Sequence, residues 1–216
     1  ESTPWLTERH GYDPTWEGRS MTKKSIAKRI VKTTVVLLLI LALAGTAFLA
    51  LFREKIDRWE YPIQYSEYVT YYADKYDIDP LMLYAFIRTE SNFDPMADSD
   101  AGARGLMQIT EVTFDWIKSK IAPTENLTFE DLYDPETNIR FGSYFVSYCL
   151  LRYQDDLPTS AAAYHSGLGT VDKLLAQAEY SDDGKTLDHY PYPQMRLYVK
   201  KITSSYQRYQ EIYTES

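Results

Sequence analysis

An uninterrupted apolar block near the N-terminus constrains this chain more than any other feature. Residues 33–52 read TTVVLLLILALAGTAFLALF and contain no charged side chain. A helix rises about 1.5 Å per residue, so a block of this length spans roughly 30 Å, the thickness of the hydrocarbon core of a membrane. The block therefore predicts one transmembrane helix over residues 33–52, and the rest of the chain remains to form the folded domain.

The charges that precede the block predict how this helix is oriented. Because basic segments tend to remain on the cytoplasmic side of a membrane, we expect residues 1–32 in the cytoplasm and everything after Phe52 outside it. Met21 looks like a natural start, so residues 1–20 are expected to be added sequence or a short cytoplasmic tail, and we assign them no function. The basic side chains on which the orientation depends are Lys23, Lys24, Lys28, Arg29 and Lys32.

A cleavable signal peptide is the alternative interpretation of the apolar block. Ala42-Leu43-Ala44 before Gly45 is a small-residue pattern typical of a cleavage site. The apolar run continues to Phe52, past the point where the apolar region of a signal should end, and this favours an uncleaved anchor. Both interpretations export the rest of the chain, so we expect a single-pass protein of the cell membrane whose main domain is extracytoplasmic.

The composition beyond the anchor excludes several kinds of partner. Residues 60–216 hold 13 Lys+Arg against 25 Asp+Glu, a net charge of about −12, and such an acidic domain argues against nucleic acid as a partner. The single cysteine, Cys149, cannot form an intramolecular disulfide, and it shows no metal-ligand spacing with the three histidines. We therefore expect no metal, no cofactor, and a domain stabilised by its packed core.

The segment after the anchor predicts a helical domain close to the membrane. Residues 53–60 form a charged juxtamembrane segment with no flexible linker behind it, so the folded domain is expected over residues 61–216. Helix signals recur along this domain, whereas the alternation typical of strands is nearly absent. The predicted fold class is therefore predominantly all-α, behind one N-terminal transmembrane helix.

Two Asp-Pro dipeptides predict where helices of this domain begin. Asp is a good N-cap and Pro suits the first helical position, so Asp79-Pro80 predicts a helix to about Ser91 and Asp134-Pro135 one to about Tyr153. Other expected features are a capping box at Thr128 and Asp131, a close approach of a neighbour at Gly142, and an apolar stripe on a terminal helix formed by Met195, Val199, Ile202, Tyr206 and Tyr209.

Glu90 is the first candidate for chemistry, because it lies near the end of a mostly apolar predicted helix. The helix dipole disfavours a carboxylate at this end, and apolar surroundings disfavour its charged form. Both effects raise the pKa, as a general acid that works near neutral pH requires. From its position alone Glu90 is more simply an ordinary surface residue, so this hypothesis depends on the motifs that follow.

Two further segments contain residues suited to binding a sugar. Residues 99–109 read SDAGARGLMQI, with glycines that let the backbone approach a ligand and a glutamine that can bond sugar hydroxyls or an acetamido group. Residues 161–167 read AAAYHSG and predict a tightly packed helix that ends at Gly167 and presents Tyr164 and His165. Taken alone, the first segment is an ordinary turn and His165 an ordinary structural histidine.

In this order and spacing, the three segments resemble the lytic transglycosylase family, which has the goose-type lysozyme-like fold. The resemblance covers about residues 65–209 and implies a helical, lysozyme-like domain. It rests on Glu90-Ser91 for the catalytic Glu-Ser of the family, residues 99–109 for S-x-x-G-A-x-G-L-M-Q-I, residues 134–139 for D-P-x-x-N-I, and residues 163–167 for A-Y-N-A-G.

The resemblance implies an enzyme that cleaves the β-1,4 bond between N-acetylmuramic acid and N-acetylglucosamine in peptidoglycan glycan strands. Glu90 would act first as general acid and then as general base, and attack by the muramoyl 6-hydroxyl would leave 1,6-anhydro ends. Tyr164 is expected to be the side chain that supports Glu90, with Tyr198 as a weaker candidate. The residues expected to bind substrate are Ser91, Ser99, Met107, Gln108, Tyr164, His165 and Tyr198.

This chain departs from the family pattern at two positions. His165 stands where the family usually has Asn, and Gln194 stands where it often has Glu. His165 can still form hydrogen bonds but titrates near neutrality, whereas Gln194 removes a charge from the edge of the predicted cleft. Both changes bear on substrate preference and pH dependence, and neither touches Glu90.

Three alternatives remain open from the sequence. A hydrolytic muramidase on the same fold would need a second carboxylate to activate water, for which Asp94, Asp98 and Asp100 are available. A non-catalytic subunit that binds peptidoglycan in an envelope assembly would explain the departures at His165 and Gln194. The anchor and the short tether also fit an enzyme that opens the wall locally for a larger envelope-spanning machine.

Overall fold

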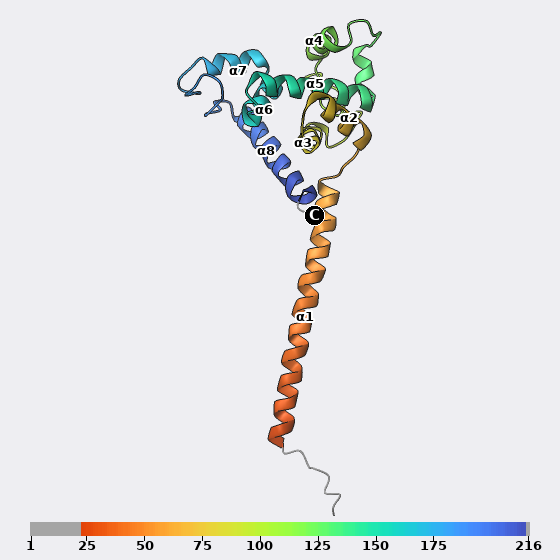
Figure 1. Cartoon of the computed structure of the whole chain (residues 1–216), viewed down its shortest axis with the longest axis vertical. Helices are drawn as coiled ribbons and strands as arrows, with labels where there is room; N and C mark the ends of the chain where they lie inside the picture. The colour runs from red at the N-terminus through yellow and green to blue at the C-terminus, as the bar shows by residue number, and fades with distance from the viewer. Residues whose placement is uncertain (1–22, 215–216) are drawn as a thin grey trace, which may run out of the picture. The chain divides into compact units, whose positions relative to one another are not determined.

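The computed structural model describes residues 23–214, so the predicted N-terminal tail lies outside the described residues as far as residue 22 (Figure 1). Within this range the chain is helical and has no strand. It divides into two compact units, one that ends at Arg53 and one that begins at Glu54. The helices are α1 (Lys23–Glu60), α2 (Ser66–Tyr76), α3 (Pro80–Ser91), α4 (Glu111–Ile121), the 3-10 helix η1 (Phe129–Tyr133), α5 (Pro135–Arg152), α6 (Leu157–Ser166), α7 (Leu168–Leu175) and α8 (Pro193–Tyr213).

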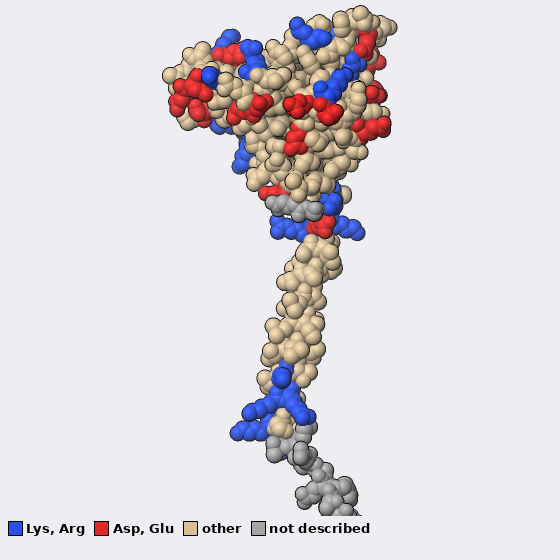
Figure 2. All heavy atoms as spheres, viewed as in Figure 1, with Lys and Arg blue, Asp and Glu red and all other residues tan. Residues whose placement is uncertain are grey.

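The first unit consists of most of α1, a helix long and apolar enough to cross a membrane. Its uncharged stretch follows the basic side chains at its N-terminal end (Figure 2). The hydroxyls of Thr33 and Thr34 donate to the carbonyls of Arg29 and Ile30, each at 2.9 Å. Hydroxyls within the apolar block are thus satisfied inside the helix, as hydrocarbon surroundings require.

In the second unit, α5 contains more buried residues than any other helix, and it packs against α2, α4, η1 and α6. Figure 1 shows α5 crossing the domain, with α6 and α7 towards one of its ends and α4 towards the other. Helix α3 contributes five consecutive buried residues, 83–87, and packs against both α2 and α8. Helix α8 in turn packs against α6, so α3, α6 and α8 meet at one place in the domain.

The structure confirms the helix starts predicted from the two Asp-Pro dipeptides. The Asp79 side chain accepts from the backbone N–H of Leu81, and the Asp134 side chain accepts from that of Thr137. Each carboxylate satisfies an N–H that has no partner inside the helix, and the proline that follows already has the required φ. The predicted predominantly all-α domain behind an N-terminal apolar helix is therefore confirmed.

Two small-residue features also agree with the sequence. A Cβ at Gly142 of α5 would lie 2.2 Å from Sδ of Met107, so only glycine allows the observed approach. Ala161, Ala162 and Ala163 of α6 are fully buried, and α6 ends at Gly167 with a φ of +85°. These close approaches bring α6 and the segment around Met107 against α5.

Candidate active site

The site is built around Glu90, in the last turn of α3. The helix stops two residues later, where Asn92 adopts the left-handed conformation with φ of +51°. Glu90 lies at a cavity of about 300 Å³ between α3, α5, α6 and the segment that precedes α4. The residues that line this cavity are Glu90, Ser99, Ala101, Ala103, Gln108, Ile109, Thr110, Thr113, Phe145, Tyr164 and His165.

The Glu90 carboxyl is held by Tyr198 of α8, whose hydroxyl donates to Oε1. Burial raises the pKa of Glu90 to about 7, although the hydrogen bond from Tyr198 and the charge of Lys201 both act to lower it. Burial and the neighbouring Glu90 raise the pKa of Tyr198 well above its ordinary value, so Tyr198 remains a hydrogen-bond donor at neutral pH. Glu90 can therefore exist in both protonation states near neutrality, as a residue that gives and then takes a proton must.

Tyr164 has a different role from the one expected, because its hydroxyl donates to the backbone carbonyl of Met107 at 2.7 Å and not to Glu90. Its ring packs against Phe86 and Phe145, with both centroid distances 5.0 Å. The Met107 carbonyl lies outside any helix and within reach of α6, so it takes the hydroxyl. The side chain that supports Glu90 is Tyr198, which the sequence analysis ranked below Tyr164.

The segment between α3 and α4 is held in place by Asn138, a fully buried residue of α5. Its amide nitrogen donates to the carbonyls of Arg104 and Leu132 at 3.0 and 2.8 Å, and its Oδ1 accepts from the Met107 N–H at 2.8 Å. A Cβ at Gly105, whose φ is +70°, would lie 2.2 Å from the Asn138 amide nitrogen. Asn138 belongs to the D-P-x-x-N-I motif, which by itself predicts no role for this side chain.

Two predicted substrate-binding residues do not reach the cavity. The Met107 side chain is fully buried against Gly142, so it positions its segment from inside the core. Ser91 donates to the Leu106 carbonyl at 2.9 Å and thereby ties the end of α3 to the same segment. Both residues therefore support the cavity wall, because their side chains are already used in packing and in hydrogen bonding within the protein.

Ser99 and Gln108 do line the cavity, as expected from the sequence. Gln108 adopts a φ of +46°, and its Nε2 donates to the carbonyls of Ala97 and Gly105, each at 3.0 Å. The Ser99 hydroxyl accepts from the Ala103 N–H at 3.0 Å. The side chains of Ser99 and Gln108 are thus held in place by the protein itself. Thr110 and Thr113, which no sequence motif indicated, also line the cavity, and their hydroxyls are hydrogen-bonded to each other at 3.0 Å.

Comparisons with known proteins agree with this architecture. The sequence family described as Transglycosylase SLT domain matches residues 67–186, more than half of the chain. The chain belongs to this family.

Named relatives of this SLT domain are lytic murein transglycosylases. The soluble lytic murein transglycosylase of Escherichia coli (strain K12) is 29% identical over 152 residues, which cover 69% of this chain and 24% of the relative. The membrane-bound lytic murein transglycosylase F of Pectobacterium atrosepticum is 28% identical over 148 residues, which cover 63% of this chain and 29% of the relative. The chain thus spans about a quarter of the length of the curated relatives it matches.

Among solved structures, the SLT domain is similar to the 70 kDa soluble lytic transglycosylase from Escherichia coli. The two superpose with a TM-score of 0.64 at 25% sequence identity, and the match covers 72% of this chain and 25% of that chain. The helical architecture inferred from the residues is therefore shared with a solved lytic transglycosylase.

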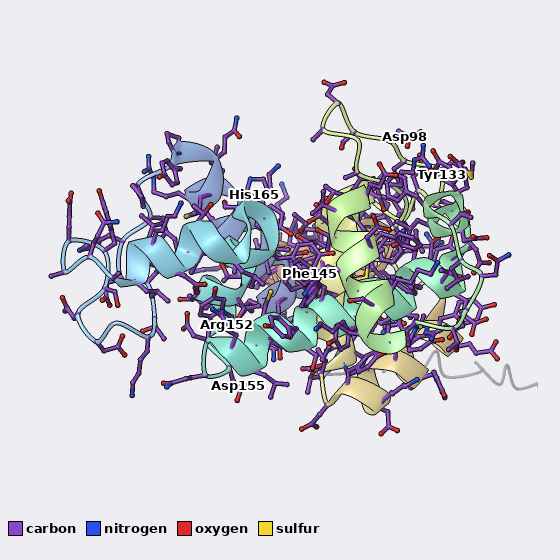
Figure 3. All side chains as sticks on the ribbon, turned by 90° about the horizontal axis from the view of Figure 1, so that it is seen from above. Asp98, Tyr133, Phe145, Arg152, Asp155 and His165 are labelled. Atoms are coloured by element: carbon purple, nitrogen blue, oxygen red, sulfur yellow. The ribbon has the colours of Figure 1, made fainter. Side chains whose placement is uncertain are left out.

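His165, the departure from the family pattern, lies exposed at the edge of the SLT-domain cavity, near the end of α6 (Figure 3). Its ring stacks on that of Tyr198, and burial together with the charge of Lys201 lowers the pKa of His165. It also lines a second cavity of about 270 Å³, on the α8 side of Glu90. The second departure, Gln194, lines this cavity too.

The three aspartates considered for a hydrolase lie elsewhere in the SLT domain. Asp98 accepts from the Tyr133 hydroxyl at 2.8 Å and lies 3.6 Å from Nε of Arg104, and Figure 3 places Asp98 and Tyr133 together, apart from His165. Asp94 and Asp100 are exposed and line neither cavity beside Glu90. Among the described residues, Glu90 is the only carboxylate in the lining of these two cavities.

Proposed function

We propose that this chain is a peptidoglycan lytic transglycosylase with Glu90 as its catalytic acid and base. The observation that carries the proposal is the state of this one carboxyl group. Burial raises its pKa to about 7, and it accepts a hydrogen bond from Tyr198. Among the described residues, no other carboxylate lines the cavity. Membership of the SLT family supports the same reaction, since the relatives of this chain are named lytic murein transglycosylases.

In the first step, protonated Glu90 donates its proton to the glycosidic oxygen between N-acetylmuramic acid and N-acetylglucosamine. Near neutral pH a substantial fraction of the enzyme carries this proton, because the pKa of Glu90 is about 7. The bond from the muramoyl anomeric carbon to that oxygen breaks, and its electrons stay with the departing sugar. The Tyr198 hydroxyl then stabilises the carboxylate that remains, as a positioned donor does for a developing charge.

In the second step, the Glu90 carboxylate takes the proton of the muramoyl 6-hydroxyl while that oxygen bonds to the anomeric carbon. The product is a 1,6-anhydromuramoyl end, and Glu90 regains its proton. No water is consumed, and the nucleophile belongs to the same sugar, which gives it a high effective concentration. One carboxyl group is therefore enough for the whole reaction.

The lining of the cavity favours this reaction over hydrolysis. A glycoside hydrolase ordinarily uses two carboxylates that flank the bond, one as acid and the other as nucleophile or base. Asp94, Asp98 and Asp100 lie outside the cavities beside Glu90, and Asp98 is already paired with Arg104. In this proposal Ser99, Gln108 and His165 bind the sugar from the cavity wall.

We further propose that α1 anchors the enzyme in the cell membrane, with the SLT domain outside the cytoplasm. Helix α1 is long and apolar enough to cross the membrane, and the basic residues at its N-terminal end favour the cytoplasm for that end. The peptidoglycan substrate lies on the other side of that membrane, so this orientation brings enzyme and substrate together. Protease protection in intact spheroplasts tests the orientation, because residues after α1 should be digested from outside.

The test of the activity is mass spectrometry of the sugars released from purified peptidoglycan by the full chain in detergent micelles. We expect 1,6-anhydromuramoyl products from the parent and none from the Glu90→Gln variant, which keeps the shape of the side chain but cannot exchange the proton. Reducing-end products would identify a hydrolase instead. If a folded parent binds peptidoglycan but releases nothing, the chain is a binding subunit.

A further inference from the structure

A basic groove continues from the Glu90 site along α8. The cavity of about 270 Å³ on the α8 side of Glu90 is lined in part by Thr89, Tyr198 and Lys201. A neighbouring cavity of about 320 Å³ is lined by Tyr61, Arg88, Thr89, Lys201, Ser204 and Ser205. Thr89 and Lys201 line both cavities, so the two hollows adjoin, and together we refer to them as the groove.

Helix α8 provides one wall of the groove. On α8, residues 197 and 198, residue 201, and residues 204 and 205 recur every three or four positions, so they share one face of the helix. The last turn of α3, residues 88–90, forms the facing wall, and α3 packs directly against α8. Two rigid helices therefore define the groove, and Glu90 lies at one end of it.

Lys201 is the free cation of this groove. It is exposed, and its ammonium group makes no hydrogen bond or ion pair with any residue between 23 and 214. Its charge acts within the groove, where it lowers the pKa of both Glu90 and His165. The surrounding domain carries a net charge of about −12, and Figure 2 shows acidic side chains, with basic ones among them, over the face in view.

Arg88, the second cation of the groove, is already held by the protein. Its Nη2 lies 3.2 Å from Oε1 of Glu60, its Nε donates to the Glu60 carbonyl at 2.9 Å, and its guanidinium stacks over the ring of Tyr61. Arg88 is therefore fixed in place and its charge is balanced by Glu60, while the Lys201 ammonium and its three donors remain available to a ligand.

The end of the groove beside Glu90 also contains the polar side chains of His165, Gln194 and Tyr198. In the cavity farther from Glu90, the other polar groups are the hydroxyls of Tyr61, Thr89, Ser204 and Ser205. The Ser205 hydroxyl is buried and has no hydrogen-bond partner among the described residues. A lining of one free ammonium, one fixed guanidinium and several hydroxyls suits a group that accepts hydrogen bonds and carries negative charge. A neutral sugar would gain little from the ammonium, whereas a carboxylate would gain a charge-assisted hydrogen bond.

We propose that this groove binds a carboxylate of the peptide carried by the muramoyl residue that reacts at Glu90, with Lys201 as its ion-pair partner. The inference rests on the proposed function. In intact glycan strands the sugars are neutral and the lactyl group is joined to the peptide, so the acidic groups of the substrate are those of the peptide. The peptide leaves the sugar ring at the reacting muramoyl residue, and the groove begins at Glu90, so the two lie within reach of each other.

The test compares two substrates and two variants of the full chain in detergent micelles. The substrates are uncross-linked glycan strands with intact peptides and the same strands after their carboxylates have been converted to amides. The variants are Lys201→Gln and the matched control Lys200→Gln, since Lys200 is an exposed neighbour that lines neither cavity of the groove. The measured quantity is the ratio of kcat/KM on native strands to kcat/KM on amidated strands.

We expect this ratio to fall about tenfold in Lys201→Gln, mainly through a higher KM, as the loss of one charge-assisted hydrogen bond predicts. Lys200→Gln should leave the ratio unchanged. Removing Lys201 also raises the pKa of Glu90, but this affects both substrates equally and cancels in the ratio. An unchanged ratio in Lys201→Gln, or an equal fall in Lys200→Gln, overturns the proposal.

A binding measurement separates this proposal from the proposed function. In the Glu90→Gln background, we expect native strands to bind about tenfold more tightly than they do when Lys201→Gln is added, with no such difference for amidated strands. If the parent cleaves nothing and this difference is still observed, the activity is wrong and the carboxylate subsite stands. If the parent cleaves both substrates and no difference is found, only the subsite is wrong.

Discussion

The imidazole of His165 stacks on the ring of Tyr198, with centroids 4.4 Å apart and ring planes 14° apart. Tyr198 is also the residue whose hydroxyl holds the Glu90 carboxyl. A position at which the chain departs from the family pattern is therefore coupled, through one aromatic ring, to the proposed catalytic acid. Protonation or substitution of His165, and substitution of Tyr198, should therefore change the pH dependence of activity.

The hydroxyl of Tyr198 should set the pKa of Glu90. Its hydrogen bond favours the carboxylate, so Tyr198→Phe should move the pKa of Glu90 above about 7 and shift the corresponding limb of the kcat/KM profile to higher pH. We also expect kcat to fall by roughly 10- to 100-fold, because the carboxylate formed in the first step loses its donor. The control is Tyr206→Phe, which removes another hydroxyl of α8 that donates to a carboxylate, that of Asp79 at 2.7 Å. An unshifted limb in Tyr198→Phe would mean that the Tyr198 hydroxyl does not contribute to the pKa of Glu90.

Protonation of His165 should lower kcat/KM on the acidic side of its pH profile. Burial and Lys201 hold the pKa of His165 below its ordinary value, so the ring is neutral at pH 7 and gains a proton only as the pH falls. The cation that then forms has a donor at both ring nitrogens, so it can no longer accept a hydrogen bond from a sugar hydroxyl in the cavity, and we expect substrate binding to weaken. His165→Asn should abolish this limb and leave the limb of Glu90 in place. A profile identical to that of the parent would show that His165 does not titrate in the working range.

Glu90 should also reduce the stability of the domain above neutral pH. Its folded pKa of about 7 is higher than the value in an unfolded chain, about 4.3, so between these values the folded state binds more protons. Stability from this group is therefore complete below pH 4.3 and is lost as the pH rises through 7. After an allowance for its partial exposure, we expect Glu90→Gln to be more stable than the parent by about 2 kcal/mol near pH 8, and by much less near pH 5. Urea unfolding followed by the fluorescence of Trp116 at both pH values measures the difference, and a stabilisation independent of pH would contradict its electrostatic origin.

The sequence predicted those parts of the molecule that depend on local rules. Asp79 and Asp134 mark helix starts because a cap and its proline act within one turn, and the apolar block of α1 is defined by its own length. Gly142 was recognised as a close approach, but the partner, Met107, could not be read from the sequence because it comes from a distant segment.

The assignments within the site were less predictable, because they depend on which groups meet in space. Tyr164 is partly buried and Tyr198 is buried, both near Glu90, and the distinction between them rests on where the Met107 carbonyl lies after folding. The same limit applies to Asn138, whose amide joins three backbone groups from two segments. Its sequence signal was its place in the D-P-x-x-N-I motif, which does not say which groups the amide contacts.

Gly105 offers a direct test of how Asn138 holds the cavity wall. In Gly105→Ala the new Cβ would lie 2.2 Å from the Asn138 amide nitrogen and 2.3 Å from the Leu132 carbonyl oxygen, at a φ of +70° that non-glycine residues rarely adopt. Asn138 would have to move and leave buried polar groups without partners, so we expect a loss of about 3 kcal/mol or more in the free energy of unfolding. Gly102→Ala is the matched control, because Gly102 has a similar φ of +73° and nothing within 4 Å of its new Cβ, so it should lose only about 1 kcal/mol. Equal losses in the two variants, measured by urea unfolding, would show that backbone strain alone accounts for the glycine and that the contact with Asn138 adds nothing.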